Sequence, residues 1–335
     1  MRAVLAALPV LLLVAGCAGA AMRAAPPAVP DPQASSGPAC GRPAGNRVWN
    51  VHDSASLLTV LARVDPGDSV VLADGSYAGH FQATRPGTRQ RPIRLCGQRS
   101  ASLTGGRTGY VLHLQQANWW VVSGLRVEGG EKGVVLDDTS NTTLTDLTVM
   151  GTGQEAVHLR TGSSHNTLSD LRISRTGLKT PAFGEGVYVG SAKENWCRYT
   201  GCGPDASDAN TIERIVFGPD VRAENIDVKE GTTGGLIARN TFNGQGATSA
   251  DSWVDIKGNG WLVRDNTGRS AARDGAQVHV RLPGWGENNV FSHNVFTVDG
   301  PGYGVRVQRG AVGTVIACSN RAPGAASGLS TEVCS

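Results

Sequence analysis

The 335-residue sequence is poor in charged and aromatic residues, and its basic and acidic residues nearly cancel. Charged residues make up 18% and aromatic residues 5%, and the net charge of +3 is too small to indicate a nucleic-acid partner. Disorder is excluded as well, because 40% of the residues are hydrophobic. Glycine is in excess, with 45 residues, and it weakens helices. We therefore expect a globular protein built from many short elements and turns.

The first residues have the pattern of an export signal. One arginine is followed by an apolar run and small residues, and the run is too short to remain as a membrane-spanning helix. It ends in Val-Ala-Gly before Cys17, which resembles the bacterial lipoprotein box, in which the cysteine is lipidated. We predict a signal peptide at 1–16, lipidation of Cys17, a flexible tether at 17–46 and a folded domain at 47–335. The protein would be extracytoplasmic and attached to the membrane through this lipid only; a plain cleaved signal peptide, giving a secreted protein, is the alternative.

Export places the other cysteines in an oxidising compartment, where an even number indicates disulfides. If Cys17 carries lipid, six remain, and their spacing does not suggest a zinc site. Several connectivities are open. We favour the pairs that would close one loop, fix the C-terminal tail and tie the N-terminal arm to the body: Cys197–Cys202, Cys318–Cys334 and Cys40–Cys96.

The body of the chain repeats a short strand with a period in the twenties of residues. In each repeat two aliphatic residues flank a variable one, and both aliphatic positions should point inward. The first inward column is Val134, Val157, Val187, Ile226, Val254, Val278 and Val305. The second is Leu136, Leu159, Val189, Val228, Ile256, Val280 and Val307. Such alternation at a fixed period indicates a parallel β-solenoid, in which stacked coils share one core.

The connections between strands complete the fold prediction. Parallel strands joined by crossovers are overwhelmingly right-handed, so we predict an all-β, right-handed parallel β-helix. Leucines with helical spacing predict a helix over 54–64, which would cap the N-terminal end of the core. Four asparagines spaced by 26, 28 and 26 residues should accept unusual backbone angles at a coil corner and form a hydrogen-bonded ladder: Asn240, Asn266, Asn294 and Asn320.

Charged and aromatic side chains occupy the outward positions of the same strands. Coils stack about 4.8 Å apart, so residues in one column are near neighbours. The basic members are Arg160, Lys229, Lys257, Arg281 and Arg306, and the acidic members are Glu185, Glu224, Asp227 and Asp255. The members that would contact a substrate also include His158, Tyr188, Trp253 and His279. A solvated face of alternating salt bridges is the alternative, but clustering over successive coils favours a groove that binds a polyanion.

Such a face suits cleavage of a uronic acid polysaccharide by β-elimination. The proton beside the uronate carboxylate is weakly acidic, so the carboxylate must be neutralised while a base removes the proton. A cation about 5 Å away lowers a lysine pKa by about 2 units, and Lys229 beside Lys257 would have this arrangement. Lys229 is the predicted base, and Lys257 and Arg281 are predicted to neutralise charge. Bound Ca²⁺ would add to this, with oxygen ligands from Glu185, Glu224, Asp227 and Asp255.

Residues 66–77, PGDSVVLADGSY, and 91–94, RPIR, are similar to the first coil of the chondroitinase B/alginate lyase family of β-helix polysaccharide lyases. Residues 224–229, ENIDVK, resemble the segment in which that family carries a calcium-ligand glutamate five residues before its lysine base. The resemblance implies a β-helix fold, Glu224 as a metal ligand and Lys229 as the base. It also implies that Lys257 takes the place of the family's catalytic arginine.

These observations predict a polysaccharide lyase that acts on an acidic polysaccharide, uses Ca²⁺, has no nucleic-acid partner and is a monomer. One alternative is a non-catalytic glycan-binding β-helix protein on the cell surface that uses the same face. The other is a glycoside hydrolase with Asp227 and Asp255 as its two carboxylates. Adjacent coils would place these carboxylates about 5 Å apart, closer than an inverting hydrolase needs.

Overall fold

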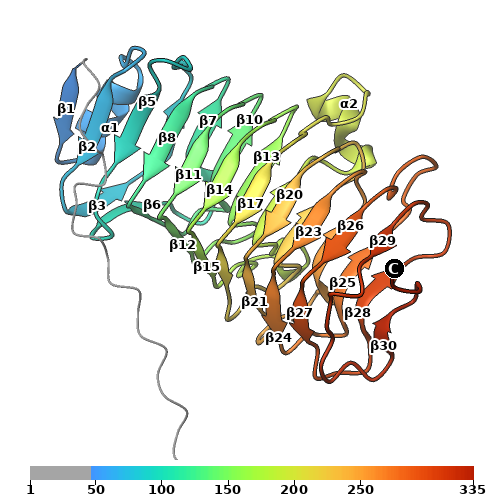
Figure 1. The fold of residues 1–335 in the computed structure, drawn as a ribbon. Helices are drawn as coiled ribbons and strands as arrows, with labels where there is room; N and C mark the ends of the chain where they lie inside the picture. Colours follow the sequence, from blue (N-terminus) through green and yellow to red (C-terminus); the bar gives the residue numbers. More distant parts are fainter. Residues whose placement is uncertain (1–46) are drawn as a thin grey trace, which may run out of the picture. The chain divides into compact units, whose positions relative to one another are not determined.

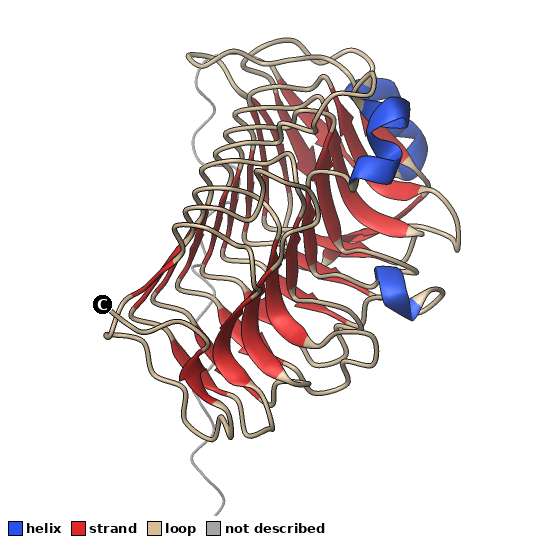
Figure 2. Cartoon of the chain, turned by 90° about the vertical axis from the view of Figure 1, so that its right-hand side faces the viewer, coloured by secondary structure: helices blue, strands red, loops and turns tan. Residues whose placement is uncertain are grey.

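Residues 47–335 form a parallel β-solenoid in the computed structural model, which describes this part of the chain (Figure 1). Each full coil contributes one strand to each of three sheets, and the coils stack along one axis (Figure 2). Neighbouring strands pair in parallel throughout the three sheets. The all-β parallel β-helix predicted from the repeat is therefore confirmed.

The chain passes through the three sheets in a fixed order. The ten-stranded sheet contains β4 (Phe81–Ala83), β7 (Tyr110–Gln115), β10 (Lys132–Asp137), β13 (Val157–Arg160), β16 (Val187–Val189), β19 (Ile226–Val228), β22 (Ser252–Ile256), β25 (Asp274–Val278), β28 (Tyr303–Val307) and β30 (Gly328–Ser330). The eleven-stranded sheet contains β1 (Val48–Val51), β2 (Ser69–Leu72), β5 (Ile93–Cys96), β8 (Trp120–Ser123), β11 (Thr143–Thr145), β14 (Thr167–Ser169), β17 (Thr211–Glu213), β20 (Leu236–Ala238), β23 (Leu262–Arg264), β26 (Val290–Ser292) and β29 (Val315–Ile316). The nine-stranded sheet contains β3 (Gly75–Ala78), β6 (Ala101–Thr104), β9 (Arg126–Glu128), β12 (Thr148–Met150), β15 (Arg172–Ser174), β18 (Val216–Phe217), β21 (Thr241–Asn243), β24 (Thr267–Arg269) and β27 (Val295–Thr297).

Helices are few in the part of the chain that the structure describes. Helix α1 (Ser54–Leu61) lies at the N-terminal end of the solenoid, where the helical spacing predicted it (Figure 1). Its apolar face is buried, through Leu57, Val60 and Leu61. Helix α2 (Trp196–Tyr199) and two 3₁₀ turns, η1 (Pro181–Phe183) and η2 (Lys193–Asn195), lie in loops. None of the described helices is long and apolar enough to cross a membrane.

The asparagine ladder is present, and its backbone geometry differs from expectation. The side-chain amide of each asparagine donates to the Oδ1 of the next one, at 2.9–3.0 Å, from Asn240 to Asn320. The positive φ angles of 55–57° belong to the residue before each of the first three asparagines: Arg239, Asp265 and His293. Each Oδ1 also accepts from a backbone N–H one coil earlier, so the ladder satisfies polar groups that the corner would leave unpaired.

The predicted strand register is correct from β10 to β22, wrong by two residues at β25, and correct again at β28, where Val305 lies in line with Val254. Val254 pairs with Ala276, and Ile256 pairs with Val278, where Val254 was expected to pair with Val278. A shift of two leaves the alternation of inward and outward residues unchanged, so the hydrophobic pattern could not reveal it. Ala276 takes the inward position expected of Val278, and Val280, also expected to point inward, lies past the end of β25. The strand is anchored by buried Asp274, whose Oδ1 accepts from the backbone N–H of Tyr303 at 2.6 Å.

Two predicted disulfides are confirmed. Cys197–Cys202 closes a loop beside the ten-stranded sheet, and Cys318–Cys334 joins the end of the last coil to the C-terminal tail. They indicate an oxidising, extracytoplasmic location. Cys40 lies outside the described residues, as do the signal peptide and Cys17, so the pair Cys40–Cys96 and the lipidation stay predictions.

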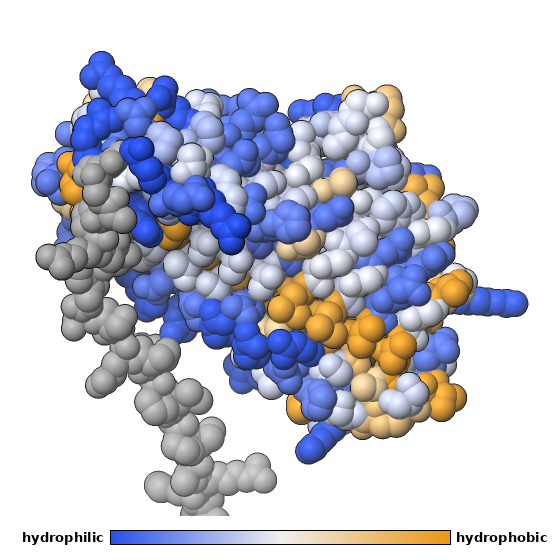
Figure 3. Space-filling view, turned by 45° about the horizontal axis from the view of Figure 1, so that its top comes forward, coloured by the Kyte–Doolittle hydropathy of each residue, from blue (hydrophilic) through white to orange (hydrophobic). Residues whose placement is uncertain are grey.

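Apolar surface gathers over the C-terminal coils (Figure 3). On the eleven-stranded sheet one outward row changes from threonine to aliphatic residues along the axis. Thr143, Thr167 and Thr211 are followed in register by Leu236, Leu262, Val290 and Val315. The polar groups described below are instead on the ten-stranded sheet.

Candidate active site

The candidate site residues lie in register on the outward face of the ten-stranded sheet. His158 in β13 pairs with Tyr188 in β16, which pairs with Asp227 in β19, and Asp227 pairs with Asp255 in β22. This order is the one expected from the sequence. The next strand supplies Gln277 beside Asp255 because of the two-residue shift, and His279 lies two residues further along, beside Lys257.

Opposite charges alternate along these strands. Lys229 Nζ lies 2.6 Å from Asp227 Oδ2, and Lys257 Nζ lies 2.8 Å from Asp227 Oδ1. Lys257 Nζ also lies 2.5 Å from Asp255 Oδ2, and His279 Nδ1 lies 2.9 Å from Asp255 Oδ1. The two lysines therefore lie on either side of one carboxylate, instead of directly beside each other.

This arrangement reverses the expected shift of the lysine pKa values. Burial alone would lower the pKa of Lys229, but the carboxylate of Asp227, followed by Glu185, raises it well above the ordinary lysine value. The pKa of Lys257 is raised in the same way by Asp227 and Asp255, although Lys229 works to lower it. The sequence argument counted the neighbouring cation but not the carboxylate between the two ammonium groups. In the free protein both lysines are cations.

Three carboxylates form a compact acidic group. Oxygens of Glu185, Glu224 and Asp227 all lie within 4.8 Å of one another. Burial, then repulsion from Asp227 and Asp255, raises the pKa of Glu224 to about 8. Burial and the neighbouring acids also raise the pKa of Glu185, whose buried Oε2 has no hydrogen-bond partner among the described residues. Asp255, also predicted as a ligand, is outside this group, and its oxygens face Lys257 and His279.

Tyr188 is at the centre of an aromatic and cationic cluster. The ammonium of Lys229 lies 4.8 Å from the centre of its ring, and the ring of His158 meets it edge-on at 4.5 Å. Burial raises the pKa of Tyr188 well above its ordinary value, with Asp227 adding to the effect, so the phenol stays protonated at neutral pH. Burial, together with Lys132 and Arg160, lowers the pKa of His158, so its imidazole is neutral. Its Nε2 donates to Gly190 O at 3.0 Å, which leaves Nδ1 as the acceptor nitrogen.

Arg160 is held in a separate network at the N-terminal side of the cluster. Its Nε and Nη2 donate to the two oxygens of Asp137 at 2.6 and 2.9 Å. The hydroxyls of Tyr110 and Tyr199 accept from its other guanidinium hydrogens at 3.0 and 3.1 Å. Burial would raise the pKa of Asp137, but hydrogen bonds from His113 and Arg160 hold it below the usual range.

A cleft of about 310 Å³ opens beside these groups, with walls that include Lys132, His158, Arg160, Tyr188, Arg198 and Tyr199. The last two come from the insertion after β16, which the Cys197–Cys202 disulfide closes. The Nε1 of Trp196 donates to Ser191 O at 2.9 Å and fixes the base of this loop. Sequence reasoning did not select Tyr110 or Lys132, because both lie at strand starts outside the recurring five-residue pattern.

Three predicted site residues lie elsewhere. Trp253 is only 2% exposed and packs against Phe242 and Phe296, because its ring fills the space beside Gly268 in the nine-stranded sheet. Arg281 is carried past the end of β25 by the register shift, and it faces Glu194 at 3.5 Å. Arg306 lines a different hollow, of about 470 Å³, near the C-terminal coils.

Comparison with known proteins identifies the family. No protein-family model and no curated protein matches the chain. An alginate lyase from Paenibacillus sp. str. FPU-7 is 34% identical, with a TM-score of 0.81, over 86% of this chain and 99% of that structure. The chain belongs to the same family as this alginate lyase. A GH136 lacto-N-biosidase from Eubacterium ramulus, 12% identical with a TM-score of 0.52 over 85% of this chain and 67% of that one, shares the fold alone.

The geometry of Asp227 and Asp255 also argues against a glycoside hydrolase that uses these two carboxylates. Asp227 and Asp255 are adjacent, but ion pairs with Lys229, Lys257 and His279 occupy both carboxylates. Burial would raise the pKa of Asp255, yet Lys257 and His279 hold it below the usual range. A hydrolase needs one protonated carboxyl group as its acid, and Asp255 is held ionised.

Proposed function

We propose that this chain is a polysaccharide lyase that cleaves alginate, a polymer of uronic acids, by β-elimination. The observation that carries the proposal is the contact between Lys229 and Tyr188 at the edge of a cation-lined cleft. Membership of the alginate lyase family supports the substrate class. In the reaction a base takes the proton beside the uronate carboxylate, the bond to the leaving glycosidic oxygen breaks, and a carbon–carbon double bond forms.

The side chains have different roles in this proposal. Lys229 is the proton acceptor once it has given up its own proton, which it carries in the free protein. We choose it because 14% of its side chain is exposed and it lies against Tyr188, whereas Lys257 is enclosed between two carboxylates. Tyr188 donates a proton or hydrogen bond to the leaving oxygen, since its phenol stays protonated. Lys257 is a positioning residue that holds Asp227, and Arg281 has no part in the reaction.

The residues present suit a calcium ion. Glu185, Glu224 and Asp227 offer the hard oxygen ligands that Ca²⁺ prefers, and the buried Glu185 Oε2 lacks a hydrogen-bond partner among residues 47–335. Bound there, Ca²⁺ would offset the acidic charge that raises the pKa of Lys229 and would help to neutralise the substrate carboxylate. Without a cation, the raised pKa of about 8 keeps Glu224 largely protonated, and it can then donate a hydrogen bond to that carboxylate.

We also propose that the protein works at the outer side of the cell membrane. The disulfides indicate an oxidising, extracytoplasmic compartment, and the proposed polysaccharide substrate agrees with it. Lipid at Cys17 and the tether at 17–46 would hold the β-helix near the membrane. Mass spectrometry of the membrane fraction tests this directly, because a diacylated or triacylated Cys17 peptide is expected and an unmodified one contradicts the anchor.

The enzymatic proposal is tested by incubating the protein with alginate, pectate, glucuronan and glycosaminoglycans, with Ca²⁺ or with a chelator. Ultraviolet absorbance of the unsaturated uronate product is expected with alginate. New reducing ends without this absorbance would indicate hydrolysis instead. Binding without any cleavage would favour the glycan-binding alternative and exclude the lyase.

A further inference from the structure

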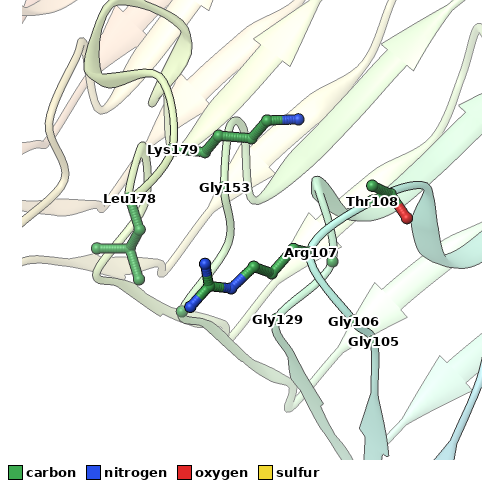
Figure 4. Close-up of a pocket in the computed structure, with 10 residues that line it drawn as sticks. Gly105, Gly106, Arg107, Thr108, Gly129, Gly153, Leu178 and Lys179 are labelled. Atoms are coloured by element: carbon green, nitrogen blue, oxygen red, sulfur yellow. The ribbon is translucent and has the colours of Figure 1, made fainter.

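A second hollow lies next to the cleft, on the turns that lead from the nine-stranded sheet into the ten-stranded sheet. Its volume is about 650 Å³, and most of its lining is glycine. Arg107 and Lys179 reach across it from opposite sides (Figure 4). No residue of this hollow belongs to the catalytic cluster described above.

The hollow and the cleft share a wall. The segment 177–184 supplies Leu178 and Lys179 to the hollow and Phe183 to the cleft. Glu131, which lines the cleft, has its Oε2 3.1 Å from Lys179 Nζ. A polymer that lies in the cleft can therefore extend across this wall into the hollow.

Stacked turns without side chains make the floor of the hollow. A Cβ atom at Gly129 would lie 2.6 Å from Gly105 O, and one at Gly130 would lie 2.7 Å from Lys132 O. Side chains are therefore excluded from these turns by close backbone packing. The result is a floor made of backbone, with the half-exposed Leu178 at its side.

The two cations of the hollow differ in whether they have an ion-pair partner. Lys179 is paired with Glu131, but the side chain of Arg107 is exposed and has no hydrogen-bond or ion-pair partner within residues 47–335. An unengaged guanidinium binds carboxylates through two parallel hydrogen bonds. An apolar side chain beside flat backbone suits the non-polar face of a sugar ring.

We propose that this hollow is a distal subsite for an acidic oligosaccharide, in which Arg107 binds the carboxylate of a uronate unit remote from the cleaved bond. The inference rests on the proposed lyase function for the identity of the polymer. It adds a requirement for chain length, because only a substrate long enough to extend from Tyr188 to the hollow gains this contact.

Two variants test the subsite by opposite means. Arg107→Ala removes the cation. Gly106→Trp should fill the hollow without disturbing the backbone, since a Cβ there meets no atom within 4 Å and the backbone is outside the left-handed region. Arg63→Ala is the matched control, since it removes an exposed arginine just after α1 that lines neither the hollow nor the cleft.

The measurement is kcat/KM for alginate oligosaccharides of increasing length. In the unaltered protein the value should rise with length, and both variants should lose about 5- to 10-fold on the long substrates, as expected for one charge-assisted contact. The loss should become smaller as the substrate becomes shorter, and for Arg107→Ala it should also become smaller at high salt. Arg63→Ala should follow the unaltered protein. Equal losses at every length, or no loss, would overturn the subsite.

Failure of the lyase proposal gives a different result. If no oligosaccharide is cleaved, the same set is titrated into the unaltered protein and into Arg107→Ala by calorimetry. Weaker binding of long oligosaccharides to the variant alone would keep the subsite without the enzyme. Identical binding by both proteins would overturn it.

Discussion

Two clusters of ionisable side chains on the same sheet have opposite electrostatic balance. Asp137 faces Arg160 and His113, and their hydrogen bonds hold its pKa below the usual range in spite of burial. Two coils further on, Glu185 and Glu224 face other acids, and burial with repulsion raises their pKa values, that of Glu224 to about 8. In the first cluster the carboxylate has cationic and hydrogen-bonding partners, and these contacts fix the side chains in place. In the second cluster the acidic groups outnumber their cationic partners and lie beside Lys229. Such an imbalance is typical of a functional site.

From this comparison we expect the largest effect on activity at Lys229, the proposed base. Lys229→Ala should lower kcat/KM on alginate by about 10³-fold, within the range of a lost general base. Folding should be preserved, since Asp227 keeps its ion pair with Lys257. Circular dichroism checks the fold, and Arg63→Ala is the control. Activity within a few-fold of the unaltered protein would show that Lys229 is not the base.

The next largest effect is expected in the first cluster. Arg160→Met should lower the free energy of unfolding by about 3 kcal/mol, because the buried Asp137 loses its partner. Adding Asp137→Asn in the same protein should recover part of this loss, since the unpaired charge is then removed. Denaturant titration measures both changes. A double variant no more stable than Arg160→Met would show that the ion pair is not what holds this region.

A smaller effect on the stability of the fold is expected at acid pH. The pKa of Asp137 is lower in the folded protein than in the unfolded chain, so its stabilisation is complete above about pH 4 and is lost as pH falls below that value. Melting temperatures between neutral and acid pH should therefore fall less steeply for Asp137→Asn than for the unaltered protein. Parallel curves would contradict the assignment.

The acidic cluster should have the opposite effect on stability, with a melting temperature that falls by a few degrees as pH rises. Glu224 has its pKa raised from 4.5 to about 8 on folding, so the unfolded chain releases this proton first and stability falls as pH rises across that window. Glu224→Gln should flatten the fall and raise the melting temperature near pH 8. Ca²⁺ should stabilise the unaltered protein more than this variant. The same calcium shift in both would exclude Glu224 as a ligand.

Much of the fold could be predicted because the core repeats. Two aliphatic residues per strand, recurring at one period, are sufficient to indicate a parallel solenoid and to align its coils from β10 to β28, except at β25. Trp253 was misplaced because its expected outward position ignored Gly268, which leaves room for a ring in the core. The two-residue shift at β25 was invisible for another reason, since alternation is unchanged by it.

The sequence by itself determined the parallel coils, the asparagine ladder, two disulfides and the column that contains Tyr188, Asp227 and Asp255, because each of these follows from period and spacing. Only the tertiary structure decided the sign of the pKa shifts. Whether Lys229 meets a cation or a carboxylate depends on side-chain directions within a few ångströms, and Asp227 lies between the two lysines. The glycine-lined hollow also required the structure, because it is formed by turns from four coils that are separate in the chain.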